Sequence, residues 1–159
     1  MKIDKVDQKI LQALVKDSSQ SIKEIATKVN LSVSPVHDRI RKMMSSGIIE
    51  GYSARINPEM MGFGLLVYIQ VRFVRHQEQL FEEFVREISR LHEVQEAVFT
   101  AGEYDALLKV YLKDMEDYQH FVLQRLSKME FISNVKSSFA MRTIASPGVI
   151  LNAERLGVL

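Results

Sequence analysis

The chain has 159 residues, 47% of them apolar, no cysteine and a formal net charge of +1. This length and apolar content fit one ordinary domain or two small ones, and the lack of cysteine excludes disulfides, thiolate metal sites and a cysteine nucleophile. No apolar run approaches the ~20 residues that cross a bilayer, and the first six residues do not resemble a signal peptide. We therefore expect a cytoplasmic protein with no membrane partner.

The charge is unevenly divided along the chain. Residues 1–57 hold ten Lys or Arg and six Asp or Glu, a net charge of +4, whereas residues 58–159 hold eleven and fourteen, a net charge of −3. The excess of basic residues at the front favours a polyanionic partner for that part of the chain.

The first 47 residues predict three helices, each opened by a capping residue. Asp4 precedes the first helix, the tetrad Ser21–Glu24 forms a capping box at the second, and Ser32 precedes the third. Asn30 suits a left-handed exit from the second helix, and Gly47 ends the third. The second and third helices are therefore joined by a turn of only three residues.

A turn this short is typical of a helix-turn-helix, whose second helix enters the major groove of DNA. Residues 48–57 are predicted as one or two short extended segments, similar to a small wing. Helical periodicity places an apolar stripe against the first two helices; this stripe consists of Val33, Val36, Ile40 and Met43. The opposite face then carries Ser34, Pro35, His37, Asp38, Arg41, Lys42 and Ser45.

This outward face suits both phosphate binding and base reading. Arg41 and Lys42 can neutralise phosphates or contact guanine edges, and Asp38 can accept a hydrogen bond from cytosine or orient a neighbouring arginine. Arg39 lies toward the side of the helix, where it suits a phosphate contact or a structural ion pair. The same pattern also fits an ordinary solvated helix, because many three-helix segments bind no nucleic acid.

From Leu65 onward the periodicity predicts strand, helix, strand, strand, helix, strand. Residues 65–73 alternate as a strand, and apolar residues recur at helical spacing over 80–91. Strands 94–100 and 104–112 are joined around Gly102, and Asp114 caps the second helix. A closing strand alternates through Val135, Ser137, Phe139 and Met141. This order predicts a ferredoxin-like βαββαβ domain.

Three regions of the chain resemble the Lrp/AsnC, or feast/famine, family of transcription regulators. They are Ile3–Leu11, Leu31–Met43 with Gly47–Tyr52, and Thr100–Val110, which contains a Gly-x-Tyr-Asp turn. The resemblance implies a sequence-specific regulator that binds double-stranded DNA through a winged helix-turn-helix. It also implies a homodimer, assembled into an octamer or another multiple of dimers, and an amino acid bound between dimers as effector.

The resemblance assigns the effector site to the loop at Gly102, Glu103, Tyr104 and Asp105. It assigns DNA binding to the third helix, at Ser34, Pro35, His37, Asp38, Arg39, Arg41 and Lys42. The residues alone also allow a role without ligand, in which Gly102 supplies a positive φ angle and Asp105 holds the turn by bonding nearby amides. Both interpretations of the loop remain open at the level of the sequence.

We thus predict an α+β chain with a DNA-binding domain over 1–57, a linker over 58–64 and a ferredoxin-like domain for dimerisation and effector binding over 65–144. A C-terminal extension over 145–159 departs from the short ending usual in the family, and it suits either an arm to a neighbouring subunit or a frayed tail. A second departure is Ser18–Ser21, where family members commonly have an arginine that contacts phosphate.

We expect no metal, no cofactor and no catalytic residue. The four histidines lack metal-ligand spacing, and no dinucleotide-binding, Walker or nucleophile-elbow motif is present. One alternative is an enzyme similar to the siroheme decarboxylases, which share this architecture, but the arginines and histidines of the second domain fall mostly on predicted helices. A second alternative is a metabolite-sensing assembly partner without DNA binding.

Overall fold

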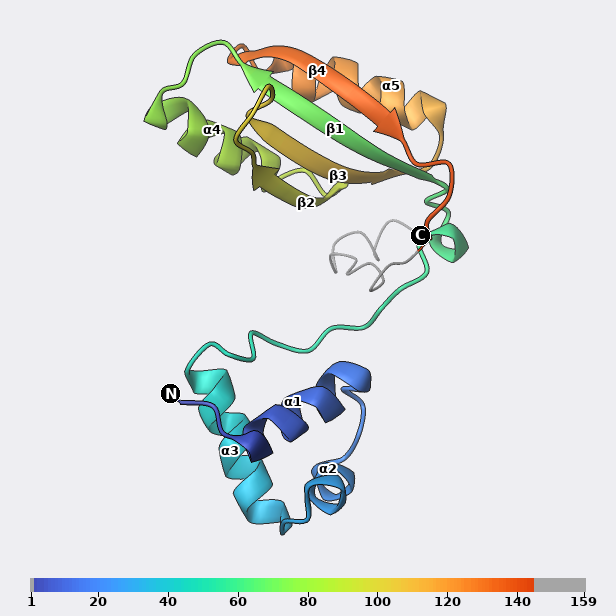
Figure 1. Ribbon diagram of the computed structural model, residues 1–159. Helices are drawn as coiled ribbons and strands as arrows, with labels where there is room; N and C mark the ends of the chain where they lie inside the picture. The colour runs from blue at the N-terminus through green and yellow to red at the C-terminus, as the bar shows by residue number, and fades with distance from the viewer. Residues whose placement is uncertain (1, 145–159) are drawn as a thin grey trace. The chain divides into compact units, whose positions relative to one another are not determined.

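The computed structural model describes residues 2–144, which form two compact units (Figure 1). The first unit extends to Ser53 and the second begins at Ala54. The C-terminal extension predicted for residues 145–159 lies outside the described residues. Pro58–Gly64, the predicted linker, belongs to the second unit, where it contains a short 3-10 helix, η1 (Glu59–Met61), and the buried Phe63.

The first unit consists of α1 (Lys5–Lys16), α2 (Ile22–Val29) and α3 (Val33–Ser45). The caps predicted at Asp4 and at the Ser21–Glu24 box are confirmed, because each side chain accepts from the first-turn amides and the third helical residue bonds back to the cap. Asn30 adopts the predicted left-handed conformation at φ 56°. These caps fix where α1 and α2 begin and where α2 ends.

The core of the first unit lies between the three helices and contains Ile10, Leu14, Ile25, Ala26, Val36, Ile40 and Met43. Two expectations about the start of α3 are wrong. Val33 is 46% exposed, because it is the first residue of α3 and the stripe turned toward the core begins at Val36. Ser32 occupies the N-cap position, but its hydroxyl makes no capping hydrogen bond.

The predicted extended segments over residues 48–57 contain no strand within the described part of the chain, and only Ile56 is an isolated bridge residue. A strand is stable only when its backbone amides and carbonyls find a partner strand. The backbone of this region therefore follows an irregular path after Gly47, which ends α3 at φ 73°.

The second unit has the predicted βαββαβ order. Its elements are β1 (Leu65–Phe73), α4 (Glu78–Ile88), β2 (Val94–Phe99), β3 (Ala106–Leu112), α5 (Met115–Gln124), a short 3-10 helix η2 (Leu126–Lys128) and β4 (Ile132–Phe139). The four strands form one antiparallel sheet in the order β2-β3-β1-β4 (Figure 1). The ferredoxin-like domain is confirmed.

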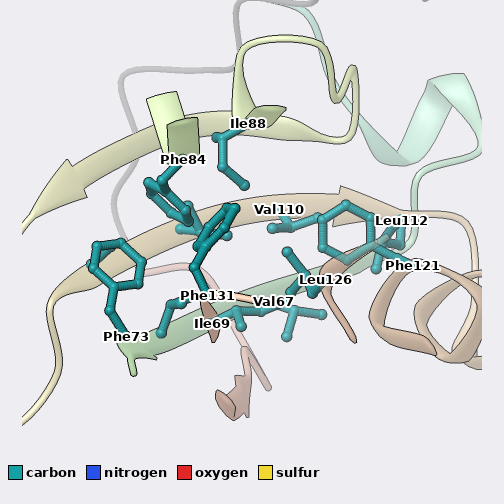
Figure 2. Packing of buried hydrophobic residues seen from close by; sticks show 13 residues of the cluster. Val67, Ile69, Phe73, Phe84, Ile88, Val110, Leu112, Phe121, Leu126 and Phe131 are labelled. Carbon is teal, nitrogen blue, oxygen red and sulfur yellow. The ribbon is translucent and has the colours of Figure 1, made fainter. Parts of the chain in front are cut away.

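The helices cover one face of this sheet. Val67, Ile69 and Val71 of β1 are fully buried, and the aromatic rings of Phe84 on α4 and Phe121 on α5 pack in the same core (Figure 2). Two residues of the predicted apolar pattern lie elsewhere. Val85 is 50% exposed on the flank of α4, and Met141 is fully exposed, because β4 ends at Phe139, opposite the start of β1.

No α-helix within residues 54–144 covers the other face of the sheet. The alternate residues Tyr68, Gln70 and Arg72 of β1 lie on it, opposite Ser138, Lys136 and Asn134 of β4. Leu107, Lys109 and Tyr111 of β3 continue the same face. At one end Phe63 is buried together with Tyr111. We call this surface the open sheet face.

Candidate nucleic-acid interface and effector loop

The outward face of α3 is exposed as predicted. Val36, Ile40 and Met43 turn toward the core, and the residues between them point to solvent. The exposed set consists of Ser34, Pro35, His37, Asp38, Arg41, Lys42 and Ser45. One helix of 13 residues therefore presents hydroxyl, imidazole, carboxylate and cationic groups on one side.

A weak charge cluster lies at the centre of this face. Asp38 Oδ1 is 3.4 Å from Arg41 Nη2 and 3.9 Å from His37 Nδ1. The Arg41 side chain is 72% exposed, so its contact with Asp38 orients the guanidinium without removing it from solvent. The Lys42 ammonium has no ion pair within the described residues. Both cations are therefore available to an external anion.

Arg39 is engaged within the unit. Its Nη1 donates to Asp4 Oδ2 and to Asp7 Oδ1, each at 2.7 Å. The Asp7 side chain is only 2% exposed, and its second oxygen accepts from the Asp4 amide at 3.1 Å. Of the two roles that the sequence left open, the structure shows the ion pair. This ion pair gives Arg39 a positioning role for α3, and its contact with DNA stays a prediction.

The ion pair also changes proton affinities at the start of α1. A hydrogen bond from the Asp7 amide, followed by the bond from Arg39, holds the pKa of Asp4 below its ordinary value. The bonds to Asp7 and then to Asp4 raise the pKa of Arg39 above its ordinary value. Both shifts favour the charged forms of Asp4 and Arg39, so charge-assisted hydrogen bonds tie α3 to the start of α1.

The loop predicted to bind an effector borders a hollow of about 210 Å³. Gly102, Glu103 and Tyr104 line it, as the resemblance implies, and Gly102 has the predicted positive φ angle, 155°. Gln70 of β1 and Lys136 of β4 also line it, and these two residues are direct neighbours across the sheet. We call this site the Gly102 hollow.

Asp105 does not line the hollow. Its Oδ2 accepts from the Phe73 amide at 2.7 Å, and its Oδ1 lies 2.7 Å from His76 Nε2. The carboxylate is 12% exposed. The structure thus shows the turn-holding role that the sequence allowed for Asp105, because this side chain joins the β2–β3 turn to the end of β1.

Arg72 holds the other side of the turn. Its Nε donates to the Glu103 carbonyl at 2.8 Å, and its guanidinium lies 5.5 Å from the centre of the Tyr104 ring. Thr100 closes the loop by donating from its hydroxyl to the Tyr104 carbonyl at 2.6 Å. The turn is therefore fixed by Arg72 of β1 and by Thr100, the residue after β2, before any ligand arrives.

Sequence reasoning missed Gln70 and Lys136. Gln70 alternates with buried residues of β1 and Lys136 with half-buried residues of β4, but nothing in the sequence indicates that β1 and β4 are neighbours in register at these positions. A cluster of three or more potential metal ligands is not found among residues 2–144. Within the same residues, every helix is too short or too polar to cross a membrane.

Two family models match the chain. Residues 3–50 match a winged helix-turn-helix DNA-binding domain, and residues 66–150 match the Lrp/AsnC ligand binding domain. The chain belongs to the Lrp/AsnC family of transcription regulators. The resemblance seen in the sequence is thereby confirmed.

Relatives extend over nearly the whole length of this Lrp/AsnC protein. It is 33% identical to the DNA-binding transcriptional activator DecR of Escherichia coli K12, over 89% of this chain and 93% of that protein. It is 30% identical to the leucine-responsive regulatory protein of Salmonella typhimurium, over 89% of this chain and 87% of that one. Its fold matches a transcriptional regulator from Neisseria meningitidis in complex with L-Met, with a TM-score of 0.86 and 32% identity over 91% of this chain and 94% of that chain. This Lrp/AsnC protein is a DNA-binding transcription regulator.

Proposed function

We propose that this Lrp/AsnC regulator reads its operator through the exposed face of α3. The observation that carries the proposal is the separation of the helix into a buried stripe and a polar face. Arg41 and Lys42 contact phosphates or guanine edges, and Asp38 orients Arg41. The remaining contacts come from Ser34, Pro35 and His37. Arg39 supports this face from behind through its ion pair with α1.

We propose further that the second unit forms the homodimer through its open sheet face. Tyr68 is 38% exposed and Val98 is 43% exposed on this face, although most apolar residues of the sheet are buried. Two such faces packed together bury these side chains and place two copies of α3 on successive half-sites of the operator. Dimers then assemble into an octamer or another multiple, as the family resemblance implies.

The Gly102 hollow is proposed to bind an amino-acid effector. Glu103 brings a carboxylate and Lys136 an ammonium group to the same hollow, and these charges complement the two ends of a zwitterion. The structural neighbour from Neisseria meningitidis was solved with L-Met. Effector binding at this loop changes the assembly of dimers, and with it the placement of the DNA-binding units, through a coupling between distinct sites.

The DNA-binding proposal is tested by fluorescence anisotropy on genomic fragments at several salt concentrations. Arg41→Ala and Lys42→Ala each lower the affinity and reduce the slope of log K against log[salt] by about 1 if the residue neutralises a phosphate. Lys113→Ala, which removes an exposed cation of the second unit, is the matched control and leaves both quantities unchanged. Affinity and slope that stay at the parent values in both α3 variants would contradict the assignment.

The effector proposal is tested by thermal-shift screening against the amino acids, because a ligand that binds only the folded state raises the melting temperature. The shift produced by an active amino acid disappears in Lys136→Ala and in Glu103→Gln. A shift that persists in both variants would place the ligand elsewhere. Lys113→Ala serves as the control, because the exposed Lys113 follows β3 and lies outside both the hollow and the open sheet face.

A further inference from the structure

A second cavity of the second unit lies away from the Gly102 hollow. It is a cleft of about 740 Å³ between α4 and the segment 124–131 that follows α5, and the loop after β1 closes one end. None of the residues lining it also lines the Gly102 hollow. We call it the helix-face cleft, because α4 and α5 cover this face of the sheet.

The floor of the helix-face cleft is apolar and firmly supported. It includes Leu80 of α4 and Leu91 shortly after that helix, together with Met129 and Phe131. Phe131 is only 7% exposed, and its ring packs edge-on at 6.1 Å from Phe73 and 6.4 Å from Phe84. Since these rings belong to the hydrophobic core, the floor is preformed. An apolar group that enters the cleft meets a fixed surface.

The rim of the cleft carries an excess of unpaired positive charge. Arg75, Arg125 and Lys128 line it, and their side chains form no ion pair or hydrogen bond with any residue in the range 2–144. Two of the acidic residues at the rim each have an arginine partner on the surface of α4 or just after it. Glu83 lies 3.6 Å from Arg86, and Glu87 accepts from Arg90 at 3.3 Å.

Glu130 is the third carboxylate of the rim, and among residues 2–144 it has no ion pair. When Arg86 and Arg90 are counted with the lining residues, five cations face three carboxylates. The rim of the cleft therefore favours an anionic group of a ligand, and the floor favours an apolar group. Its volume falls within the ~300–1,000 Å³ usual for small-molecule sites, which combine an apolar lining with a few convergent polar groups.

We propose that the helix-face cleft binds a small organic anion with an apolar body. The head is a carboxylate or a phosphate, held by charge-assisted hydrogen bonds from Arg125 and Lys128, with Arg75 on the opposite rim. The apolar body lies on Leu80 and Phe131. This site is separate from the proposed effector hollow and does not depend on DNA binding.

Isothermal titration calorimetry of the full-length protein with octanoate and with octyl phosphate tests the proposal, and octanamide serves as the uncharged analogue. Saturable binding is expected for one or both anions. Replacing the head group by an amide weakens binding at least about tenfold, and Arg125→Ala/Lys128→Ala weakens anion binding by a similar factor, because charged hydrogen bonds are lost. The relative affinity of the two anions identifies the head group.

The control variant Lys113→Ala/Arg142→Ala removes the same number of positive charges from other surfaces of the second unit and leaves the affinity unchanged. Far-ultraviolet circular dichroism and urea unfolding establish that both double variants are folded. Three results would overturn the proposal: no saturable binding of either anion up to 10 mM, equal binding of octanamide, or unchanged affinity in Arg125→Ala/Lys128→Ala. Loss of binding in Lys136→Ala alone would place the anion in the Gly102 hollow and equally overturn it.

Discussion

Replacing Arg39 by alanine is the sharpest test of how α3 is held against α1. The substitution removes both hydrogen bonds of 2.7 Å and leaves the Asp7 carboxylate, 2% exposed, with one partner, the Asp4 amide at 3.1 Å. Removing one partner of a fully buried ion pair costs about 3–5 kcal/mol. The Arg39 side chain is 32% exposed, so water enters after the substitution and reduces this cost.

We therefore expect Arg39→Ala to lower the free energy of unfolding of the first unit by about 2 kcal/mol, a factor of about 30 in its unfolding equilibrium constant. Native-state hydrogen exchange measured by NMR on the full chain reports this free energy for the amides of α1 and α3 separately from those of the second unit. The protection of the second unit is expected to stay at its parent value.

Arg41→Ala is the matched control, because it removes the same residue type from the same helix. Its partner Asp38 is 51% exposed and 3.4 Å away, so the expected loss is below about 0.5 kcal/mol. Adding Asp7→Asn to Arg39→Ala removes the uncompensated charge and recovers part of the stability. The reasoning is refuted if Arg39→Ala costs no more than Arg41→Ala, or if Asp7→Asn worsens the loss.

Three further expectations follow from the same structure. A backbone amide of α1 and Arg39 lower the pKa of Asp4 in the folded protein. The contribution of Asp4 to the free energy of unfolding is therefore complete above its ordinary pKa of 3.8 and is lost as the pH falls through the lower pKa of the folded state. Urea unfolding of the first unit as a function of pH measures this loss, and Arg39→Ala makes it smaller. Phe121→Ala empties a core position that is 1% exposed and lowers the free energy of unfolding of the second unit by about 3–4 kcal/mol in urea denaturation. Leu123→Ala, on the same helix and 62% exposed, is the control and costs far less. Asp105→Ala leaves a β1 amide without its acceptor at 2.7 Å and destabilises the turn by about 1–3 kcal/mol, seen as faster hydrogen exchange around Gly102, and unchanged exchange would disprove the turn-holding role.

Much of the fold is specified by local chemistry that can be read along the chain. A capping residue satisfies amides within its own first turn, so Asp4, Ser21 and Asp114 mark helix starts without reference to the rest of the molecule. The alternation over β1, which separates buried Val67 from exposed Tyr68, is also local, because it depends only on the pleat of one strand. These predictions are confirmed.

The exposed face of α3 was also readable, because three buried residues define the opposite side. Periodicity was less reliable at the ends of elements. Val33 continues the apolar pattern of α3 but lies in its first turn, before the helix reaches the core. Met141 continues the pattern of β4 but lies beyond the last residue that pairs with β1. The extent of packing at an element's end depends on what lies beside it, and a single-chain pattern contains no such information.

By itself, then, the sequence determined the order of helices and strands, their caps and the polar face of α3, because each depends on residues close together in the chain. Only the tertiary structure decided the pairings. Arg39 reaches Asp7 across 32 positions, Asp105 reaches the Phe73 amide across another 32, and Lys136 borders the Gly102 hollow through its register with β1. Periodicity indicates which way a side chain points but not which distant group it meets. The ion pair of Arg39 and the turn contact of Asp105 were among the alternatives that the sequence left open, and only the packing shows them.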